Sequence, residues 1–221
     1  MSGVELVENR IHDPQDNEVL IEVKAASVNF PDLLMTQGKY QHKPELPFGL
    51  GMEGSGIVRS VGTKVSKVKE GDEITFGALG KGAFTELICV NENSVEIKPS
   101  NLSFEQAAAF QTAYLTAYVS LVRRGELVKG ENLLVHGATG GVGMAAVQLG
   151  KYLGAKVIAT GTSEEKLKET INWGADHTVI THKRDKVEFR DEVKELTGGL
   201  GADVIYAVSY THLTLPTIYS V

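Results

Sequence analysis

The segment GATGGVG, residues 137–143, has the glycine spacing of a loop that binds phosphate groups. Its pattern, G-x-x-G-x-x-G, is less specific than the G-x-G-x-x-G pattern of many dinucleotide-binding proteins. Glycines let the backbone approach a pyrophosphate closely, and a helix that begins there directs its unpaired N–H groups at the negative charge. A glycine turn with a purely structural role is the alternative. We expect a dinucleotide to contact this loop through Gly137, Thr139, Gly140, Gly141 and Val142.

A strand and a helix must flank such a loop, and the sequence predicts both. The apolar run LLVH at 133–136 is long enough for one buried strand of a parallel sheet. Apolar residues then recur at helical spacing over 141–153. The strands and helices that alternate afterwards, typical of βαβ units, are expected at 156–160, 163–173, 178–180, 187–196 and 203–206. Residues 111–208 are thus interpreted as a partial Rossmann domain, a doubly wound parallel sheet in which 203–206 lies beside 133–136.

Residues 1–110 have a different character, with short strands separated by glycine turns. The strands are expected at 19–25, 55–61, 72–76 and 83–90. Many short strands at this spacing favour a small irregular β-barrel. Ser103 and Gln106 form a capping box that begins an alanine-rich helix, and a helical pattern continues over 113–122. The predicted fold is therefore α/β, with two domains that meet near residue 110.

The composition is that of an ordinary globular protein, and it argues against several functional classes. The 221 residues are 42% apolar with a formal net charge of −6, and no cluster of Lys or Arg favours nucleic-acid binding. No apolar run reaches the roughly 18 residues of a membrane span, and the first residues do not form a signal peptide. Cys89 is the only cysteine, which excludes an internal disulfide and a cysteine-cluster zinc site. We expect Cys89 to be a buried strand thiol and the protein to be cytoplasmic.

Four motifs resemble those of one known family, and the resemblance covers about residues 18–206. The motifs are ASVNFPD at 26–32, GKY at 38–40, GMEGSGIV at 51–58 and VHGATGGVG at 135–143. With these motifs the chain is similar to the zinc-independent, zeta-crystallin-like quinone oxidoreductases of the medium-chain dehydrogenase/reductase superfamily. The resemblance implies a GroES-like barrel before the Rossmann domain and hydride transfer from NADPH to a quinone or another carbonyl-conjugated alkene. It also implies a homodimeric parent protein.

The residues at two of these motifs argue against zinc. Zinc-dependent relatives have a cysteine before the aspartate that corresponds to Asp32 and a histidine before the glutamate that corresponds to Glu53. Here those positions hold Asn29 and Met52, and the six histidines do not cluster along the sequence. A catalytic zinc needs about three His, Cys or carboxylate ligands, so no metal is predicted. We expect Glu53 to organise the cleft and Asp32 to cap local backbone.

The choice between NADPH and NADH depends on the end of the second Rossmann strand. NAD sites usually have Asp or Glu about 20 residues beyond the glycine turn, bonded to the ribose 2′-OH. Here the sequence is ATGTSEEK, with a neutral strand end and a lysine one turn into the helix. The resemblance implies that Ser163, Lys166 and His182 bind the 2′-phosphate of NADPH. Alternatively, Thr162 and Glu165 form a capping box with a structural role.

On the substrate side, the implied reaction needs orientation and a proton. Asn29 is a candidate for hydrogen bonding to substrate or cofactor, and Tyr40 resembles the tyrosine that enoyl reductases of this superfamily use as proton donor. Thr116 corresponds to a family position near the nicotinamide. The structural alternatives are that Asn29 and Tyr40 only close a turn and that Thr116 bonds to its own helix backbone. A 2-enoyl thioester reductase is the alternative function, for which Tyr40 is the discriminating residue.

The last residues depart from the family. Residues 209–221, SYTHLTLPTIYSV, match none of its motifs and resemble translated adaptor or vector sequence, so we exclude them from the expected fold. The family continues with further strands after 203–206 and has another strand pair before residue 18. A third hypothesis is therefore a truncated fragment without catalysis, in which strand 203–206 is an exposed edge prone to association.

Overall fold

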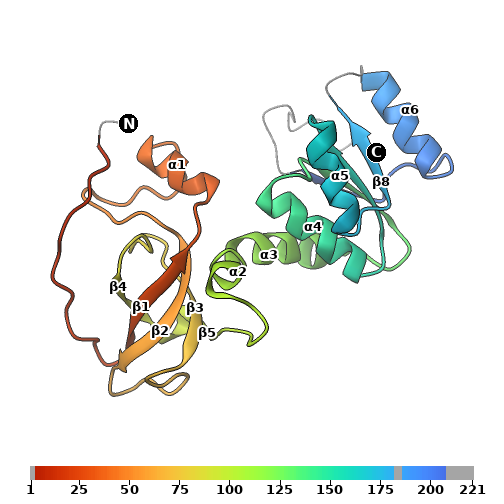
Figure 1. The fold of residues 1–221 in the computed structure, drawn as a ribbon. Coiled ribbons are helices and arrows are strands. Elements are labelled where there is room, and N and C mark those ends of the chain that lie inside the picture. Colours follow the sequence, from red (N-terminus) through yellow and green to blue (C-terminus); the bar gives the residue numbers. More distant parts are fainter. Residues whose placement is uncertain (1–2, 182–185, 208–221) are drawn as a thin grey trace. The chain divides into compact units, whose positions relative to one another are not determined.

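The computed structural model describes residues 3–181 and 186–207. The chain divides into two compact units, Met1–Thr112 and Ala113–Val221, close to the boundary expected near residue 110. Each unit has its own apolar core. Figure 1 follows the chain through both units. In the described part of the chain, no helix is long and apolar enough to cross a membrane.

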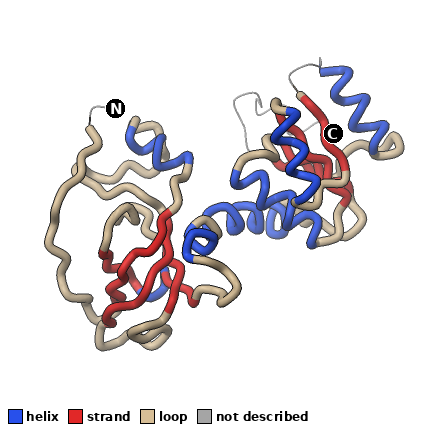
Figure 2. The backbone as a smooth tube through the Cα atoms, viewed as in Figure 1, coloured by secondary structure: helices blue, strands red, loops and turns tan. Residues whose placement is uncertain are grey.

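The first unit contains a five-stranded antiparallel sheet with the order β4-β1-β2-β3-β5 (Figure 2). Its strands are β1 (Glu18–Ala26), β2 (Glu53–Val61), β3 (Glu73–Gly77), β4 (Leu87–Asn91) and β5 (Val95–Ile97). Successive side chains point to opposite faces of a strand, and accordingly Val19 and Ile21 of β1 are fully buried while Leu20 between them is partly exposed. They pack with Val58, Ile74 and Phe76 from the neighbouring strands. The expected domain of short β-strands is therefore confirmed, and its strands pair in an antiparallel sheet.

Strand β4 is shorter than the strand expected at 83–90, and the first half of that prediction is wrong. Gly82 has φ +92, a left-handed conformation that glycine adopts without steric cost, and it turns the chain. The amides of Ala83 and Phe84 then donate to carbonyls of the loop before β2 instead of joining the sheet ladder. Regular pairing with β1 begins only at Leu87.

The helices of this unit are short, namely α1 (Phe30–Thr36), the 3₁₀ turn η1 (Glu92–Ser94) and α2 (Phe104–Ala108). The predicted capping box at α2 is confirmed. Gln106 N donates to Ser103 Oγ at 3.2 Å, and Ser103 N donates to Gln106 Oε1 at 3.0 Å. Both bonds satisfy backbone N–H groups that the first turn of a helix leaves unpaired.

The second unit contains a parallel sheet with the order β8-β7-β6-β9. Its strands are β6 (Asn132–His136), β7 (Lys156–Gly161), β8 (His177–Ile180) and β9 (Val204–Ala207). The helices are α3 (Gln111–Tyr118), which begins in the first unit, the π-helix η2 (Val119–Arg124), α4 (Gly141–Tyr152), α5 (Glu164–Asn172) and α6 (Lys186–Leu196). The alternation of strand and helix is confirmed, as is the expected place of the last strand beside β6.

Apolar side chains on both faces of this sheet are covered by helices, as in a doubly wound fold. On one face, Leu133 and Val135 of β6 pack in a core that includes Ala145 of α4 and Leu167 of α5. On the other face, alternate strand residues pack against α6, including its Val193. The sheet thus buries two apolar faces, which explains why its strands are continuous apolar runs in the sequence.

Candidate functional site

The loop between β6 and α4 is a tight turn that begins at Gly137. This residue directly follows β6 and has φ +69, a backbone conformation that costs an L side chain strain. Gly140 N donates to Gly137 O, and Ala138 N donates to Thr160 O of β7 at 3.0 Å. The turn is therefore fixed to the ends of two adjacent strands, at the carboxyl edge of the sheet where α/β proteins bind their ligands.

The middle of this loop is open to a ligand. A Cβ atom added to Gly140 would come no closer than 3.8 Å to Gly137 O, and one added to Gly141 would meet nothing within 4 Å. Both glycines are exposed. The absence of side chains here leaves room for another molecule to approach the backbone itself.

Gly143 has the opposite surroundings. A Cβ atom at this position would overlap the Gly137 carbonyl oxygen and would lie 2.7 Å from Ala138 Cα. The first turn of α4 therefore packs directly against the backbone of the loop. In a dinucleotide-binding loop, one glycine makes the tight turn, a second leaves open space for the ligand and a third permits close packing of the helix. Here these roles belong to Gly137, Gly140 and Gly143, in that order.

The N-terminus of α4 faces this open space with free backbone donors. Gly140 is the N-cap residue, and within the described structure no side chain caps the helix there. The first amides of a helix have no intrahelical partner and carry a partial positive charge, so they favour an anion. Ala145, Ala146 and Val147 are fully buried and hold the helix against the sheet. The other two predicted contacts, Thr139 and Val142, are half-buried within the segment 137–143.

His136, the last residue of β6, is a part of this site to which the sequence analysis gave no role. Its Nδ1 is hydrogen-bonded to Thr160 Oγ1 at 2.9 Å, and its ring lies 5.5 Å from the ring of Phe189 on α6. Burial lowers the pKa of His136 below its ordinary value, so the ring is neutral at neutral pH. Its position directly before the first glycine is the sequence signal that could have identified it.

The end of β7 is neutral, as expected, but its capping differs from the expected alternative. Ser163, not Thr162, is the N-cap of α5, and its Oγ accepts a long hydrogen bond of 3.4 Å from Lys166 N. The capping box of Thr162 with Glu165 is therefore wrong, because the helix begins one residue later than that pairing requires. Lys166 is exposed, so its ammonium group can reach a ligand.

Two further predicted cofactor residues, Thr116 and His182, lie outside the segment 137–143 in the sequence. His182 lies outside the described residues. Thr116 lies in the middle of α3 and is exposed.

A buried carboxylate organises the predicted substrate side in the first unit. Glu53, at the start of β2, is 2% exposed. Its Oε1 accepts from Ser27 Oγ at 2.6 Å and from Asn29 Nδ2 at 2.9 Å, and its Oε2 accepts from Thr112 N at 2.7 Å. Asn29 Nδ2 also donates to Ser27 Oγ at 2.8 Å. Both N–H bonds of the Asn29 amide are thus used, and the amide oxygen is the group that it can offer to a ligand.

Asp32 acts on the backbone rather than on a ligand. Its Oδ2 accepts from Asn29 N at 2.8 Å and its Oδ1 accepts from Gly51 N at 3.0 Å. These bonds tie the start of α1 to the loop that precedes β2. The expected capping role of Asp32 is confirmed, and the organising role of Glu53 agrees with its three donors.

Tyr40 follows α1 and Gly38, which has φ +64. The side chain is half-buried. Among the described residues, the structure gives its hydroxyl no hydrogen-bond partner. A phenol in this state is available to donate a proton to a ligand.

Comparison with known proteins gives matches over most of the chain. Residues 15–100 match the family described as "Alcohol dehydrogenase GroES-like domain", and residues 141–221 match "Zinc-binding dehydrogenase". The second match extends into the segment 209–221, which was expected to lie outside the family and falls outside the described residues.

The similar curated proteins include quinone oxidoreductases. The human quinone oxidoreductase is 36% identical over 192 residues, or 87% of this chain and 57% of that protein. Quinone oxidoreductase 1 of Escherichia coli is 38% identical over 194 residues, or 88% of this chain and 58% of that protein. The chain thus spans less than three fifths of the length of these relatives.

Two solved structures show the same fold. The Escherichia coli quinone oxidoreductase complexed with NADPH is 36% identical, with a TM-score of 0.76 over 87% of this chain and 58% of that chain. The CurK enoyl reductase is 31% identical, with a TM-score of 0.79 over 89% of this chain and 60% of that chain. The similarity to each of these proteins includes residues of both units.

Proposed function

Because the chain belongs to the medium-chain dehydrogenase/reductase superfamily, we propose that it serves an oxidoreductase that transfers hydride from NADPH to a quinone or another carbonyl-conjugated alkene. The observation that supports this best is the division of roles among Gly137, Gly140 and Gly143 in the loop after β6. The NADPH complex of the similar Escherichia coli enzyme supports the same cofactor. A cytoplasmic, homodimeric parent protein is part of the proposal.

We propose that this reaction proceeds without zinc, although one matching family is described as zinc-binding. The residues at the family's catalytic zinc position do not fit a zinc ion. Asn29 uses both of its N–H donors on Ser27 and Glu53, and Met52 supplies only a thioether. The Glu53 carboxylate already accepts three hydrogen bonds. Zinc takes thiolate, imidazole or carboxylate ligands, so no step of the reaction is assigned to zinc at this position.

The loop and the first turn of α4 fit the pyrophosphate of a dinucleotide. Gly140 and Gly141 leave the backbone accessible, and the amides of α4 supply unpaired donors. Thr139 and Val142 border the same space. When bound, NADPH supplies a hydride from its nicotinamide ring. The residues of the loop bind and orient the cofactor and take no part in bond making.

NADPH is favoured over NADH by the neutral end of β7 and by Lys166 on α5, although the first turn of α5 also carries Glu164 and Glu165. No carboxylate occupies the end of β7, where an Asp or Glu would bind the 2′-OH of NAD and repel a 2′-phosphate. Ser163 Oγ makes only a long hydrogen bond at the helix N-terminus, and Lys166 is exposed one turn later. We assign the 2′-phosphate to these two residues, with His182 as a further predicted contact.

In the first unit, Asn29 and Tyr40 are proposed to act on the substrate or the cofactor. The Glu53 network fixes the Asn29 amide so that its oxygen can accept a hydrogen bond from a ligand. Tyr40 is proposed to donate the proton that accompanies hydride transfer, because its half-buried hydroxyl has no hydrogen-bond partner among the described residues. Thr116 remains a predicted contact near the nicotinamide.

A 2-enoyl thioester reductase is the second candidate function. It is favoured by the likeness to the CurK enoyl reductase and by the half-buried hydroxyl of Tyr40. The two candidates share the cofactor and the loop. They differ in whether the Tyr40 proton is essential.

Nucleotide titration of the chain tests the proposal first. We expect NADPH fluorescence to change on binding, with an affinity in the micromolar range, about −8 kcal/mol. Oxidation of NADPH is then followed with 1,4-benzoquinone and with a 2-enoyl thioester as acceptors. A folded chain that binds neither NADPH nor NADH contradicts the proposal. Binding without turnover supports the hypothesis of a fragment that lacks catalysis.

A further inference from the structure

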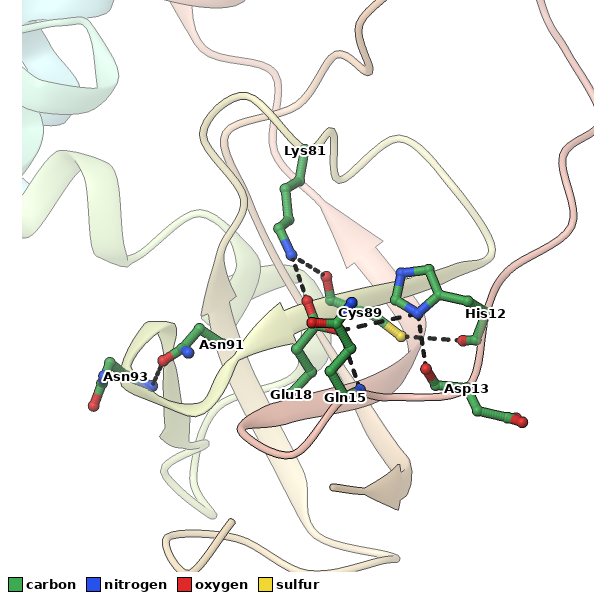
Figure 3. A network of polar contacts seen from close by, with 8 residues as sticks. All are labelled: His12, Asp13, Gln15, Glu18, Lys81, Cys89, Asn91 and Asn93. Atoms are coloured by element: carbon green, nitrogen blue, oxygen red, sulfur yellow. Dashed lines mark hydrogen bonds and ion pairs between the residues drawn. The ribbon is translucent and has the colours of Figure 1, made fainter. Parts of the chain in front are cut away.

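Three side chains with metal-ligating atoms meet on one face of the first sheet, at the opposite end of β1 from Glu53. They are His12, Glu18 and Cys89, and their ligand atoms all lie within 4.8 Å of one another. Figure 3 shows the imidazole ring, the carboxylate and the thiol turned toward one another. We propose that these three residues bind a thiophilic divalent cation such as Zn²⁺.

The fold explains how residues so distant in sequence come together. Glu18 is the first residue of β1, and Cys89 on β4 pairs with Leu20 of β1. Residues 18 and 20 point to the same face of β1, so the side chains of Glu18 and Cys89 share that face. His12 reaches them from the segment that precedes β1. The sequence analysis expected no metal from other residues. It did not consider this cluster, in which 77 positions separate His12 from Cys89.

The present hydrogen bonds leave one oxygen of Glu18 directed at the cluster. Oε1 accepts from Lys81 Nζ at 2.9 Å. Oε2 accepts from Gln15 N at 3.2 Å and lies 3.9 Å from His12 Nδ1. The carboxylate can therefore bind a metal through Oε2 while Oε1 keeps its ion pair with Lys81.

The other two ligands need only local changes. The His12 side chain is 59% exposed, so its ring can turn from its 2.8 Å contact with Asp13 O toward the cation. Cys89 is 3% exposed, and its Sγ lies 3.5 Å from His12 O. When the metal–sulfur bond forms, the S–H bond breaks and its proton passes to the solvent.

The donor set decides the class of cation. One nitrogen, one oxygen and one sulfur suit Zn²⁺ and Cd²⁺, whereas Mg²⁺ and Ca²⁺ prefer oxygen ligands alone. The ammonium group of Lys81 weakens the site by repelling the cation, since it lies 2.9 Å from the same carboxylate. A bound cation would join the segment before β1 to both β1 and β4.

Titration of the metal-free chain with ZnCl₂ in a calorimeter tests this site. We expect one equivalent to bind, with at least about tenfold weaker binding in Cys89→Ser and in His12→Ala. His42→Ala is the matched control, because His42 is exposed and lies outside the cluster, and it should bind as the unchanged chain does. Co²⁺ should give a thiolate-to-metal absorption band that Cys89→Ser abolishes.

Lys81→Gln provides a test that does not depend on a loss of binding. It removes the repelling charge but keeps a hydrogen-bond donor, so binding should strengthen several-fold. Equal binding in the unchanged chain and in folded Cys89→Ser, or a Co²⁺ complex without the thiolate band, would overturn the proposal. NADPH binding, measured in the same variants, should not change, so the site can fail without the proposed function failing.

Discussion

At the loop after β6, adding one side chain should weaken ligand binding without affecting folding. Gly140 has φ −91 and ψ 169, a conformation that valine adopts readily, and a Cβ there meets no close neighbour. Gly140→Val should therefore fold normally but fill the space of the pyrophosphate. We expect NADPH binding to weaken by about a hundredfold or more, measured by fluorescence titration alongside a thermal melt.

Gly140→Ala supplies the graded control, with an intermediate loss. Unchanged affinity in folded Gly140→Val would refute the assignment of the loop. Gly143→Ala is unsuitable for this purpose, because its Cβ overlaps the Gly137 carbonyl oxygen and damages the loop itself.

The preference for NADPH is testable at Lys166. Lys166→Glu places a carboxylate where a 2′-phosphate is proposed to bind, so NADPH should bind roughly tenfold more weakly while NADH changes little. Lys168→Glu makes the same change of charge on an exposed residue of the same helix and serves as the control. Equal losses for both nucleotides in Lys166→Glu would show that this lysine does not contact the phosphate.

The role of Tyr40 distinguishes the two candidate functions. If Tyr40 is the essential proton donor of an enoyl reductase, Tyr40→Phe should lower kcat for a 2-enoyl thioester by about a hundredfold, the usual size of general acid catalysis. Quinone reduction should fall much less, because water can protonate a quinone oxygen after hydride transfer. Tyr152→Phe, at a residue that is 86% exposed, is the control. Equal retention of both activities would leave Tyr40 with a structural role only.

The individual residues of the site were predictable only where a local pattern carries the chemistry. The glycines of the loop and the capping role of Asp32 follow from spacing along a few residues. Glu53 accepts three hydrogen bonds, and one of them comes from Thr112 N, 59 positions away, so no local pattern shows it. The cap at Ser163 was missed because Thr162 and Ser163 are both good caps, and one residue of helix length decides between them.

At the level of the elements, the pair formed by β6 and β7 carries a pH dependence. The neutral ring of half-buried His136 bonds to Thr160 across these strands, and partial burial lowers the pKa of the histidine. The unfolded chain therefore takes up a proton at higher pH than the folded chain does, and acid favours unfolding. This contribution to stability is complete above the ordinary pKa of 6.5 and is lost as the pH falls through the lower pKa of the folded state.

We therefore expect the urea midpoint of the second unit to fall between about pH 7.5 and about pH 5, and to fall less in His136→Gln. His177→Gln, which changes an exposed histidine at the start of β8, should retain the full dependence. A variant His136→Gln with the same pH profile as the unchanged chain would show that this ring does not titrate on unfolding.

The order and type of the elements could be read from the sequence because periodicity is a local property. Each strand of the parallel sheet is an apolar run, and each helix buries one stripe of residues, so both are visible in short windows. The start of β4 and the π-helix η2 were not predictable. The start of β4 is set by backbone hydrogen bonds from Ala83 and Phe84 to a loop some 30 residues earlier. The π-helix differs from an α-helix in its hydrogen-bond register, which leaves the spacing of apolar residues nearly unchanged.

At the level of the whole molecule, β9 is an open edge. In the described sheet it pairs with β6 on one side only, and its Ile205 is 45% exposed. Unpaired edge strands invite association with another chain. We expect the chain to self-associate, and Ile205→Lys to raise the monomer fraction in analytical ultracentrifugation. Tyr152→Lys, an exposed apolar residue on α4 in the same unit, should have no such effect. A chain that is monomeric without any substitution would contradict the prediction.

The close packing of Gly143 on the loop backbone has a consequence for the thermodynamics of binding. Ordering a flexible loop costs about 1–2 kcal/mol of conformational entropy for each residue. Here Gly137 is locked in its turn, Ala138 is bonded to β7, and α4 leaves no room for the backbone to shift. Most of this conformational entropy is lost when the chain folds, before a nucleotide binds. Nucleotide binding should therefore leave backbone order parameters over residues 137–143 almost unchanged, and the ordering of this loop should subtract little from the affinity.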